Sequence, residues 1–143
     1  MLTTSDATRL VTDLYGRWIQ CLMGRQFDWL ERHLSSDFLF TAQPFPTIRM
    51  NKHEFIEADK KIENAKISFV SIAAEPIEDI IISRAIADVE ETFHADLGPG
   101  MPTAEEITRA ISGQRIAYCS GWRHTGEIWE CFDHHVIGLV ARR

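Results

Sequence analysis

Residues 114–142, QRIAYCSGWRHTGEIWECFDHHVIGLVAR, decide the fold, because a single tight turn can join their two long runs into a β-hairpin. Gly126 suits that turn, since glycine accepts a positive φ at little steric cost. With Thr125 and Gly126 as the turn, counting backwards along both strands predicts that Tyr118 lies opposite Asp133. Residues directly opposite one another share a face of the sheet. The turn therefore predicts which side chains of the hairpin lie together.

One face of the predicted hairpin is mostly apolar and aromatic, yet it carries the polar groups of Tyr118, Asp133 and His135. The side chains on this face are Ile116, Tyr118, Ser120, Trp122, Trp129, Cys131, Asp133, His135 and Ile137. Buried polar groups need hydrogen-bond partners, so the cluster is either a self-satisfied part of the core or the polar floor of a ligand cavity. The sequence leaves both interpretations open. A slip of one residue in the register would move Asp133 to the other face.

Composition and charge exclude several classes of protein. The 143 residues suit one domain spanning residues 1–143, with 45% hydrophobic and 25% charged residues. The net charge is −6 with no basic run, so we expect no nucleic-acid partner. The N-terminal residues do not resemble a signal peptide, and no apolar run reaches transmembrane length. Three cysteines without CxxC spacing indicate free thiols, and we expect a cytoplasmic protein that does not bind membranes.

The rest of the chain predicts helices at 5–23, 28–34, 51–64 and 103–111, with strands at 38–41, 65–83 and 84–96. Trp18 lies on the apolar stripe of the first helix, and Tyr15 flanks that stripe. In the strand 84–96 the odd positions form the buried face, with Glu91 as the exception. Glu91 either points into a cavity or returns to solvent at a bulge. The helix-bearing connection 97–111 is longer than a hairpin needs, so it is either a lid over a pocket or packing at its rim.

This order of elements resembles the nuclear transport factor 2-like (NTF2-like) superfamily, and within it the SnoaL-like, polyketide cyclase-like branch. The resemblance rests on three segments, FDWLERHLSSDFLF, MNKHEFIE and SGWRHTGEIWECFDHHV, and it covers nearly the whole chain. It implies an α+β fold in which a highly curved mixed β-sheet wraps against three N-terminal helices to form a cone. It also implies a small apolar ligand at the mouth of the cone and a homodimer formed through the sheet.

The resemblance further implies a cavity and the residues that line it. The expected lining residues are Tyr15, Trp18, Phe40, Glu91, Trp122, Trp129 and Cys131, around Tyr118, Asp133 and His135. The aspartate base of the ketosteroid isomerases aligns with Ala42, so that base is missing. The aspartate and histidine of the dehydratase-like branch are missing as well.

Metal and nucleophile chemistry have little support in the sequence. His134 and His135 are adjacent, so on a strand they face opposite ways and cannot chelate one ion together. Cys131 lies in apolar surroundings, which raise the pKa of a thiol and make it inert. We expect no metal and no cofactor.

Two functions remain. In the first, a small enzyme acts by general acid–base chemistry on an apolar, cyclic compound, as an isomerase, cyclase or lyase. His135 accepts the proton, Asp133 orients His135, and Tyr118 donates a hydrogen bond to a developing oxyanion. In the second, the chain is a non-catalytic ligand-binding or assembly module, and the cluster only satisfies itself.

Overall fold

The six strands form one curved sheet in the order β2-β1-β6-β5-β4-β3. The computed structural model describes residues 2–141. The strands are β1 (Leu34–Ala42), β2 (Arg49–Met50), β3 (Ile62–Ile77), β4 (Ile80–Phe93), β5 (Gln114–Thr125) and β6 (Ile128–Leu139). All neighbours are antiparallel except β1 and β6, which are parallel. The sheet is therefore mixed, as the sequence predicts.

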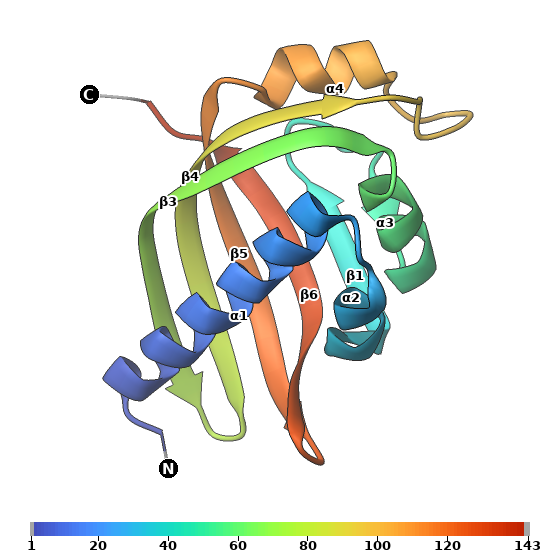
Figure 1. Cartoon of the computed structure of the whole chain (residues 1–143). Helices are drawn as coiled ribbons and strands as arrows, with labels where there is room; N and C mark the ends of the chain where they lie inside the picture. Colours follow the sequence, from blue (N-terminus) through green and yellow to red (C-terminus); the bar gives the residue numbers. More distant parts are fainter. Residues whose placement is uncertain (1, 142–143) are drawn as a thin grey trace.

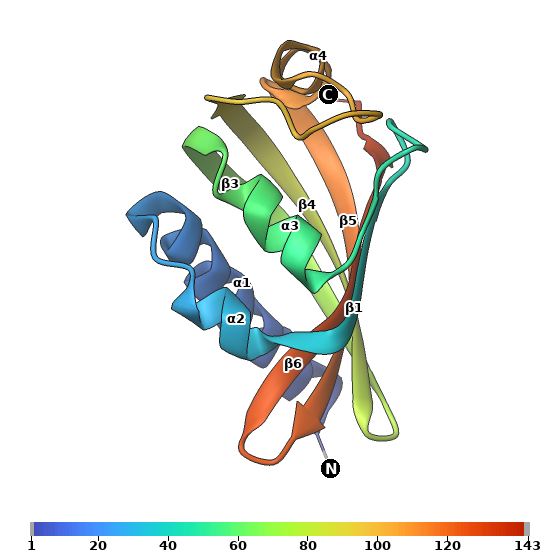
Figure 2. The ribbon, with the colours of Figure 1, turned by 90° about the vertical axis from the view of Figure 1, so that its right-hand side faces the viewer.

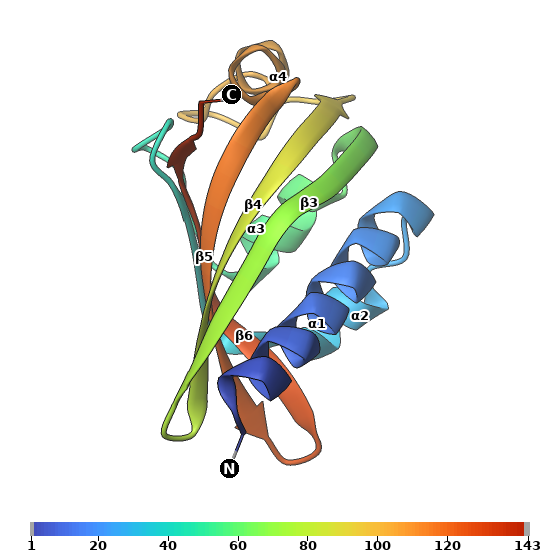
Figure 3. The ribbon, with the colours of Figure 1, turned by 90° about the vertical axis from the view of Figure 1, so that its left-hand side faces the viewer.

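Three N-terminal helices cover the concave face of this sheet (Figures 1, 2 and 3). They are α1 (Thr4–Gly24), α2 (Asp28–His33) and α3 (Lys52–Asp59). Capping boxes begin α1 at Thr3 and α3 at Asn51, where the cap side chain and the N3 carboxylate satisfy free backbone N–H groups. The predicted cone of a curved mixed sheet against three helices is confirmed.

The fourth helix, α4 (Ala104–Ile111), lies in the connection between β4 and β5 at one end of the sheet (Figure 1). Thr103 and Glu106 form its capping box, as the sequence indicates. Its buried residue, Ile107, turns towards the interior, and Ile111 packs against the sheet residues Ala87, Val89 and Ile116. The connection thus covers the wide end of the cone with apolar side chains.

Some boundaries differ from those predicted. β3 and β4 turn at Glu78 and Asp79, where Glu78 has a φ of 55°, and not after Ser83. α3 ends at Asp59, about a turn before the predicted end at Asn64, because β3 begins at Ile62 and pairs with β4. Pairing within the sheet outweighs the helical preference of this short segment.

The core lies between α1 and the sheet. Trp122 is completely buried there, and its ring meets the ring of Tyr15 edge-on at 5.6 Å. Trp18 meets Phe55 from α3 and Trp122 from β5 in the same way. Edge-to-face aromatic pairs contribute beyond the area that they bury, so these rings fix α1 and α3 against the sheet.

Candidate functional site

A cavity of about 150 Å³ opens between the helices and the concave face of the sheet. Its walls are mostly aliphatic and aromatic. They come from α1, β1 and the loop after it, β2, α3, β3, β4, α4, β5 and β6. Cavities of this kind, apolar with a few converging polar groups, are the usual form of small-molecule sites.

Two carboxyl groups interrupt this apolar lining. Asp59 ends α3 and is 8% exposed, and its Oδ2 has no hydrogen-bond partner among the described residues. Glu91 lies on β4, on the same face as the buried residues Ala87 and Val89. Both carboxyl groups line the cavity. Glu91 therefore takes the first of its two predicted alternatives and points inward.

Burial changes the acidity of both groups. Loss of water raises the pKa of Glu91 from 4.5 to about 7, because the charged form is disfavoured in apolar surroundings. Burial also raises the pKa of Asp59, and the nearby charge of Glu91 raises it further, while the indole of Trp18 opposes the rise. Burial therefore favours the acid form of Asp59, and Glu91 exchanges its proton near neutral pH.

Tyr118 and His134 form the polar part of the cavity wall that belongs to the hairpin. Their rings stack with a centroid distance of 5.2 Å and an interplanar angle of 11°. Burial raises the pKa of Tyr118 well above its usual range, and Glu91 adds to this rise. Burial lowers the pKa of His134 to about 3, with a smaller effect from His135. Both side chains are therefore neutral at pH 7, and Tyr118 remains a hydrogen-bond donor.

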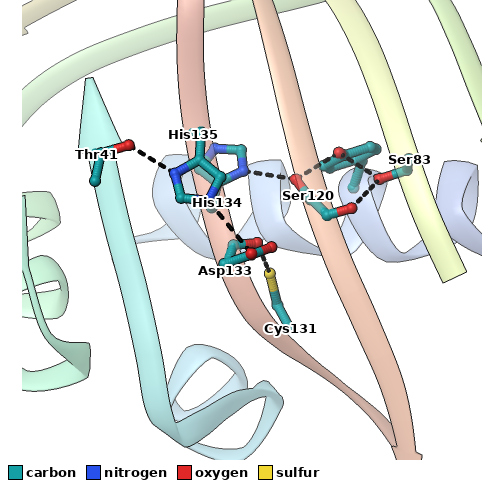
Figure 4. Close-up of polar contacts among 8 residues, drawn as sticks. Thr41, Ser83, Ser120, Cys131, Asp133, His134 and His135 are labelled. Atoms are coloured by element: carbon teal, nitrogen blue, oxygen red, sulfur yellow. Dashed lines mark hydrogen bonds and ion pairs between the residues drawn. The ribbon is translucent and has the colours of Figure 1, made fainter. Parts of the chain in front are cut away.

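A chain of hydrogen bonds holds the His134 ring through its Nδ1 atom (Figure 4). The Nδ1 atom of His134 lies 2.7 Å from the Ser120 hydroxyl, which lies 2.7 Å from the hydroxyl of Tyr15. Tyr15 also contacts Ser83 at 2.9 Å, and the indole N–H of Trp122 donates to Ser83 at 3.0 Å. Each hydroxyl of this buried chain has a partner, and the bond to Nδ1 holds the His134 ring at one orientation.

The hairpin register differs from the predicted one in three places. The turn residues are Gly126 and Glu127, since Thr125 pairs with Ile128. This change moves each partner by two positions and leaves the faces unchanged. A β-bulge then places Phe132 between the pairs Trp122–Cys131 and Gly121–Asp133, and a second shift follows between Tyr118–Val136 and Ala117–Gly138. An extra residue in one strand reverses the face of the residues that follow it, here as far as the second shift.

Gly121 makes this bulge possible. A Cβ atom at Gly121 would lie 2.4 Å from the Phe132 ring and 2.7 Å from the Asp133 carboxylate, which is closer than atoms can pack. Without a side chain at Gly121, the Phe132 ring can lie directly over the strand. The Arg123 guanidinium lies 5.2 Å from the centre of the same ring. The combination of a buried glycine with a neighbouring aromatic residue is thus the local cause of the altered register.

The bulge moves two residues of the predicted catalytic cluster, Asp133 and His135, out of the cavity. Asp133 pairs with Gly121 and His135 pairs with Cys119, so both side chains lie on the convex face, away from the cavity. Tyr118 pairs with Val136 and not with Asp133. Residue 134 takes the inward position that the prediction gave to residues 133 and 135. The structure does not bring Tyr118, Asp133 and His135 together.

Asp133 and His135 form a cluster of their own on the convex face (Figure 4). The carboxylate of Asp133 lies 3.3 Å from Nε2 of His135, and Nδ1 of His135 lies 2.6 Å from the Thr41 hydroxyl. The side chains of His135 and Asp133 are 29% and 34% exposed. This pair has the composition of a catalytic dyad, but it lies on an open surface.

The expected lining residues divide into two groups. Tyr15, Trp18, Phe40, Glu91 and Tyr118 line the cavity, as the resemblance implies. Trp122 and Cys131 are completely buried in the core below it, and Trp129 is half-buried near the hairpin tip beside His124. The apolar surroundings raise the pKa of the Cys131 thiol. Among residues 2–141, no group of three His, Cys, Asp or Glu side chains is arranged to hold a metal ion.

The sequence-based reasoning missed Asp59 and His134 as cavity residues. Asp59 lies within the segment that was predicted to continue as helix, and its spacing gave no sign of a partner on a distant strand. The alternation of residues 85–93 placed Glu91 on the buried face of its strand. The bulge in the hairpin has no such signal in the sequence, because it depends on the contact between Gly121 and Phe132 of the neighbouring strand.

Comparison with known proteins identifies the fold. No protein-family model matches the chain, and no curated protein matches it. Solved structures do match. An NTF2-like protein from Cytophaga hutchinsonii superimposes with a TM-score of 0.70 at 13% identity, over 89% of this chain and 93% of that one. An NTF2-like superfamily protein from Salmonella enterica gives a TM-score of 0.71 at 9% identity, over 97% and 95% of the two chains.

A third structure is a candidate Ca/calmodulin-dependent kinase II association domain from Exiguobacterium sibiricum. It has a TM-score of 0.66 at 17% identity and covers 100% of this chain and 99% of the other. The chain therefore has the NTF2-like fold. The similar structures include an NTF2-like protein of unknown function from Pseudomonas putida. Within the described residues, no helix is long and apolar enough to cross a membrane.

Proposed function

We propose that the protein binds a small, largely apolar molecule in the cavity and acts on it by general acid–base chemistry. The single observation that carries this proposal is the pair of carboxyl groups, Asp59 and Glu91, in an otherwise apolar cavity. Titratable groups with strongly shifted pKa values collect at catalytic sites, because burial adjusts them to exchange protons near neutral pH.

In this proposal Glu91 is the proton acceptor. A carboxylate whose pKa is raised to about 7 is a stronger base than an exposed one, yet it is still partly ionised at neutral pH. Tyr118 is the donor to a developing oxyanion, because its hydroxyl stays protonated at all ordinary pH values. Asp59 also lines the cavity and is a second carboxyl group that can hydrogen-bond to the substrate. Asp133 and His135 take no part, since they lie on the other side of the sheet.

This chemistry would suit an isomerase, cyclase or lyase of the SnoaL-like branch, working on a cyclic compound. The proton acceptor, however, comes from β4 and not from the positions of the familiar family bases. The alternative function is a non-catalytic ligand-binding or assembly module. The similar candidate association domain from Exiguobacterium sibiricum favours this alternative, because that protein is described by its role in association.

Elimination of nitrobenzisoxazole tests the catalytic proposal without knowledge of the natural substrate. A base removes the ring C–H proton, the electron pair forms the nitrile, and the N–O bond breaks to give a coloured phenolate. We expect Glu91→Gln to lower the rate by about 100-fold, the usual contribution of a positioned base. The matched control is Glu90→Gln, because Glu90 is the exposed neighbour on the opposite face of the same strand. Equal rates in the wild type and Glu91→Gln would reject Glu91 as the base.

We also propose a homodimer formed through the convex face of the sheet. Ile82 and Ile86 from β4 pair with Gly121 and Ala117 from β5 on that face, where no helix covers them (Figure 3). Arg84 lies between these two isoleucines on the same face, and uncovered apolar side chains of this kind are typical of interaction surfaces. Light scattering should give the mass of two chains at micromolar concentration, and Ile86→Glu should give the mass of one. A wild-type protein with the mass of one chain would reject the dimer.

A further inference from the structure

The side chains that line the cavity can supply negative charge but no positive charge at pH 7. Asp59 and Glu91 line it, and no Lys or Arg side chain is among its lining residues. His134 also lines it, but burial lowers the pKa of this imidazole to about 3, so it is neutral at pH 7. A ligand with a carboxylate or a phosphate would find no counter-charge here and would face two acidic groups. The cavity therefore selects against anions.

The Asp59 side chain is incompletely bonded. Its Oδ2 is buried without a partner among the described residues, and the side chain as a whole is 8% exposed. A buried carboxyl oxygen without a hydrogen bond is costly, by about 1–3 kcal/mol, unless a ligand supplies the missing donor. Asp59 also lines the cavity, which has room for that ligand. The orphaned atom thus indicates what the ligand carries at this end, namely an N–H or O–H group.

The surroundings of Asp59 favour a positively charged donor over a neutral one. Asp59 is the last residue of α3, and the C-terminal end of a helix carries partial negative charge that stabilises cations. The cationic side chains of the flanking segments are occupied elsewhere. Arg25 donates to the carbonyl oxygens of Ile62 and Lys60, and Lys61 donates to that of Leu97. Neither side chain is among the cavity-lining residues.

The aromatic rings around the carboxyl groups add a further attraction for a cation. Rings attract cations through their negative faces, most strongly where water is excluded. The aromatic side chains of the lining are Tyr15, Trp18, Phe40, Phe45, Phe55, Phe69, Phe93 and Tyr118. Rings combined with acidic groups are the usual means by which proteins hold organic ammonium groups.

We propose that the cavity binds a compact, largely apolar amine, whose protonated nitrogen donates to the carboxylates of Asp59 and Glu91. The ammonium group stabilises the ionised form of the carboxyl groups that it contacts, and the apolar body of the amine fills the aromatic part of the cavity. This inference rests on the ligand-binding half of the function proposed above, and it narrows the ligand to organic amines.

Three probes of nearly equal shape test the inference by calorimetric titration at pH 7. They are naphthylmethylamine, which is a cation, naphthylmethanol, which is neutral, and naphthoate, which is an anion. We expect the amine to bind at least about tenfold more tightly than the alcohol, since its hydrogen bonds are charge-assisted. Naphthoate should bind more weakly than both. Equal affinities for the amine and the alcohol would overturn the inference while leaving a ligand-binding cavity in place.

The variants Asp59→Asn and Glu91→Gln keep the shape of each side chain and remove its charge. Each should lower the preference for the amine by at least about fivefold and leave the affinity for the alcohol unchanged, which also shows that the variant is folded. Glu90→Gln is the matched control and should change neither affinity. A preference that persists in both variants would place the amine elsewhere and overturn the inference. If none of the three probes binds, both the ligand-binding function and the inference fail.

The two proposals fail separately. Tight amine binding together with no base-catalysed elimination leaves the inference standing and removes the catalytic function. Rapid elimination without an amine preference leaves the catalytic function standing and removes the inference.

Discussion

The two faces of the sheet hold polar clusters of similar composition in very different surroundings. On the concave face, His134 is 8% exposed, bonded to Ser120 and stacked on Tyr118. On the convex face, its neighbour His135 contacts Asp133 and Thr41, and its side chain is 29% exposed. Adjacent residues of one strand thus lie in a buried cavity wall and on an open surface.

The difference shows that residue types alone do not make a site. A histidine beside an aspartate has the composition of a catalytic pair, but on the convex face it lacks an enclosed, apolar volume that would hold a substrate. The concave face has that volume, and there two carboxyl groups, Asp59 and Glu91, have raised pKa values. Enclosure, more than composition, decides which cluster can do chemistry.

The largest expected effect concerns the packing that supports the concave face. Trp122→Ala removes a completely buried ring and the N–H that donates to Ser83. We expect a loss of about 3–5 kcal/mol in the free energy of unfolding, measured by urea denaturation. The matched change on the convex face is Phe132→Ala, which removes a half-buried ring and should cost about 1–2 kcal/mol. A larger loss for Phe132→Ala would reverse the ranking of the two faces.

An intermediate effect concerns the pH dependence of stability. The pKa of Glu91 is raised in the folded state, so between pH 4.5 and about 7 the unfolded chain releases this proton and the folded chain retains it. Stability therefore falls as the pH rises through this window, and Glu91 contributes no further change above it. We expect this contribution to be about 3 kcal/mol, from about 1.4 kcal/mol for each pKa unit of the rise from 4.5 to about 7.

The measurement is urea unfolding of the wild type and Glu91→Gln from pH 4.5 to 8. The variant lacks the titrating group, so its stability should fall less over this range. Asp59 contributes in the same direction in both proteins, and less in the variant, because the charge of Glu91 no longer raises its pKa. Glu90→Gln, on the exposed side of β4, should follow the wild-type curve. Parallel curves for the wild type and Glu91→Gln would show that Glu91 titrates as an exposed carboxylate.

The smallest expected effect belongs to the convex cluster. Asp133→Asn removes one partner of a partly exposed ion pair, and such pairs contribute at most about 1 kcal/mol. We expect an equally small change in unfolding free energy and no change in the affinity for naphthylmethylamine. His134→Leu, the comparison on the concave face, removes the partner of Ser120 and should cost about 1–3 kcal/mol. Loss of amine binding in Asp133→Asn would mean that the convex pair acts on the cavity after all.

The sequence by itself determined the caps of α3 and α4, the alternation of β4 and the presence of the hairpin, because these depend on contacts between residues close together in the chain. Asn51 and Thr103 each satisfy a backbone N–H group three residues ahead, so their signal is local. Alternation also placed Glu91 on the buried face of its strand, but it left open whether a bulge returns that side chain to solvent. The resemblance of the whole pattern to the NTF2-like superfamily added the curved sheet and the position of the cavity.

Only the tertiary structure decided which hairpin residues face the cavity and which carboxyl group completes it. The strand repeat has a period of two, so the one extra residue at Phe132 exchanges the roles of residue 134 and residues 133 and 135. That bulge depends on a ring lying over Gly121 from the neighbouring strand. Asp59 faces Glu91 only because α3 ends early and packs across the mouth of the sheet. Contacts between distant segments of the chain carry no periodic signal, and they require the folded structure to be seen.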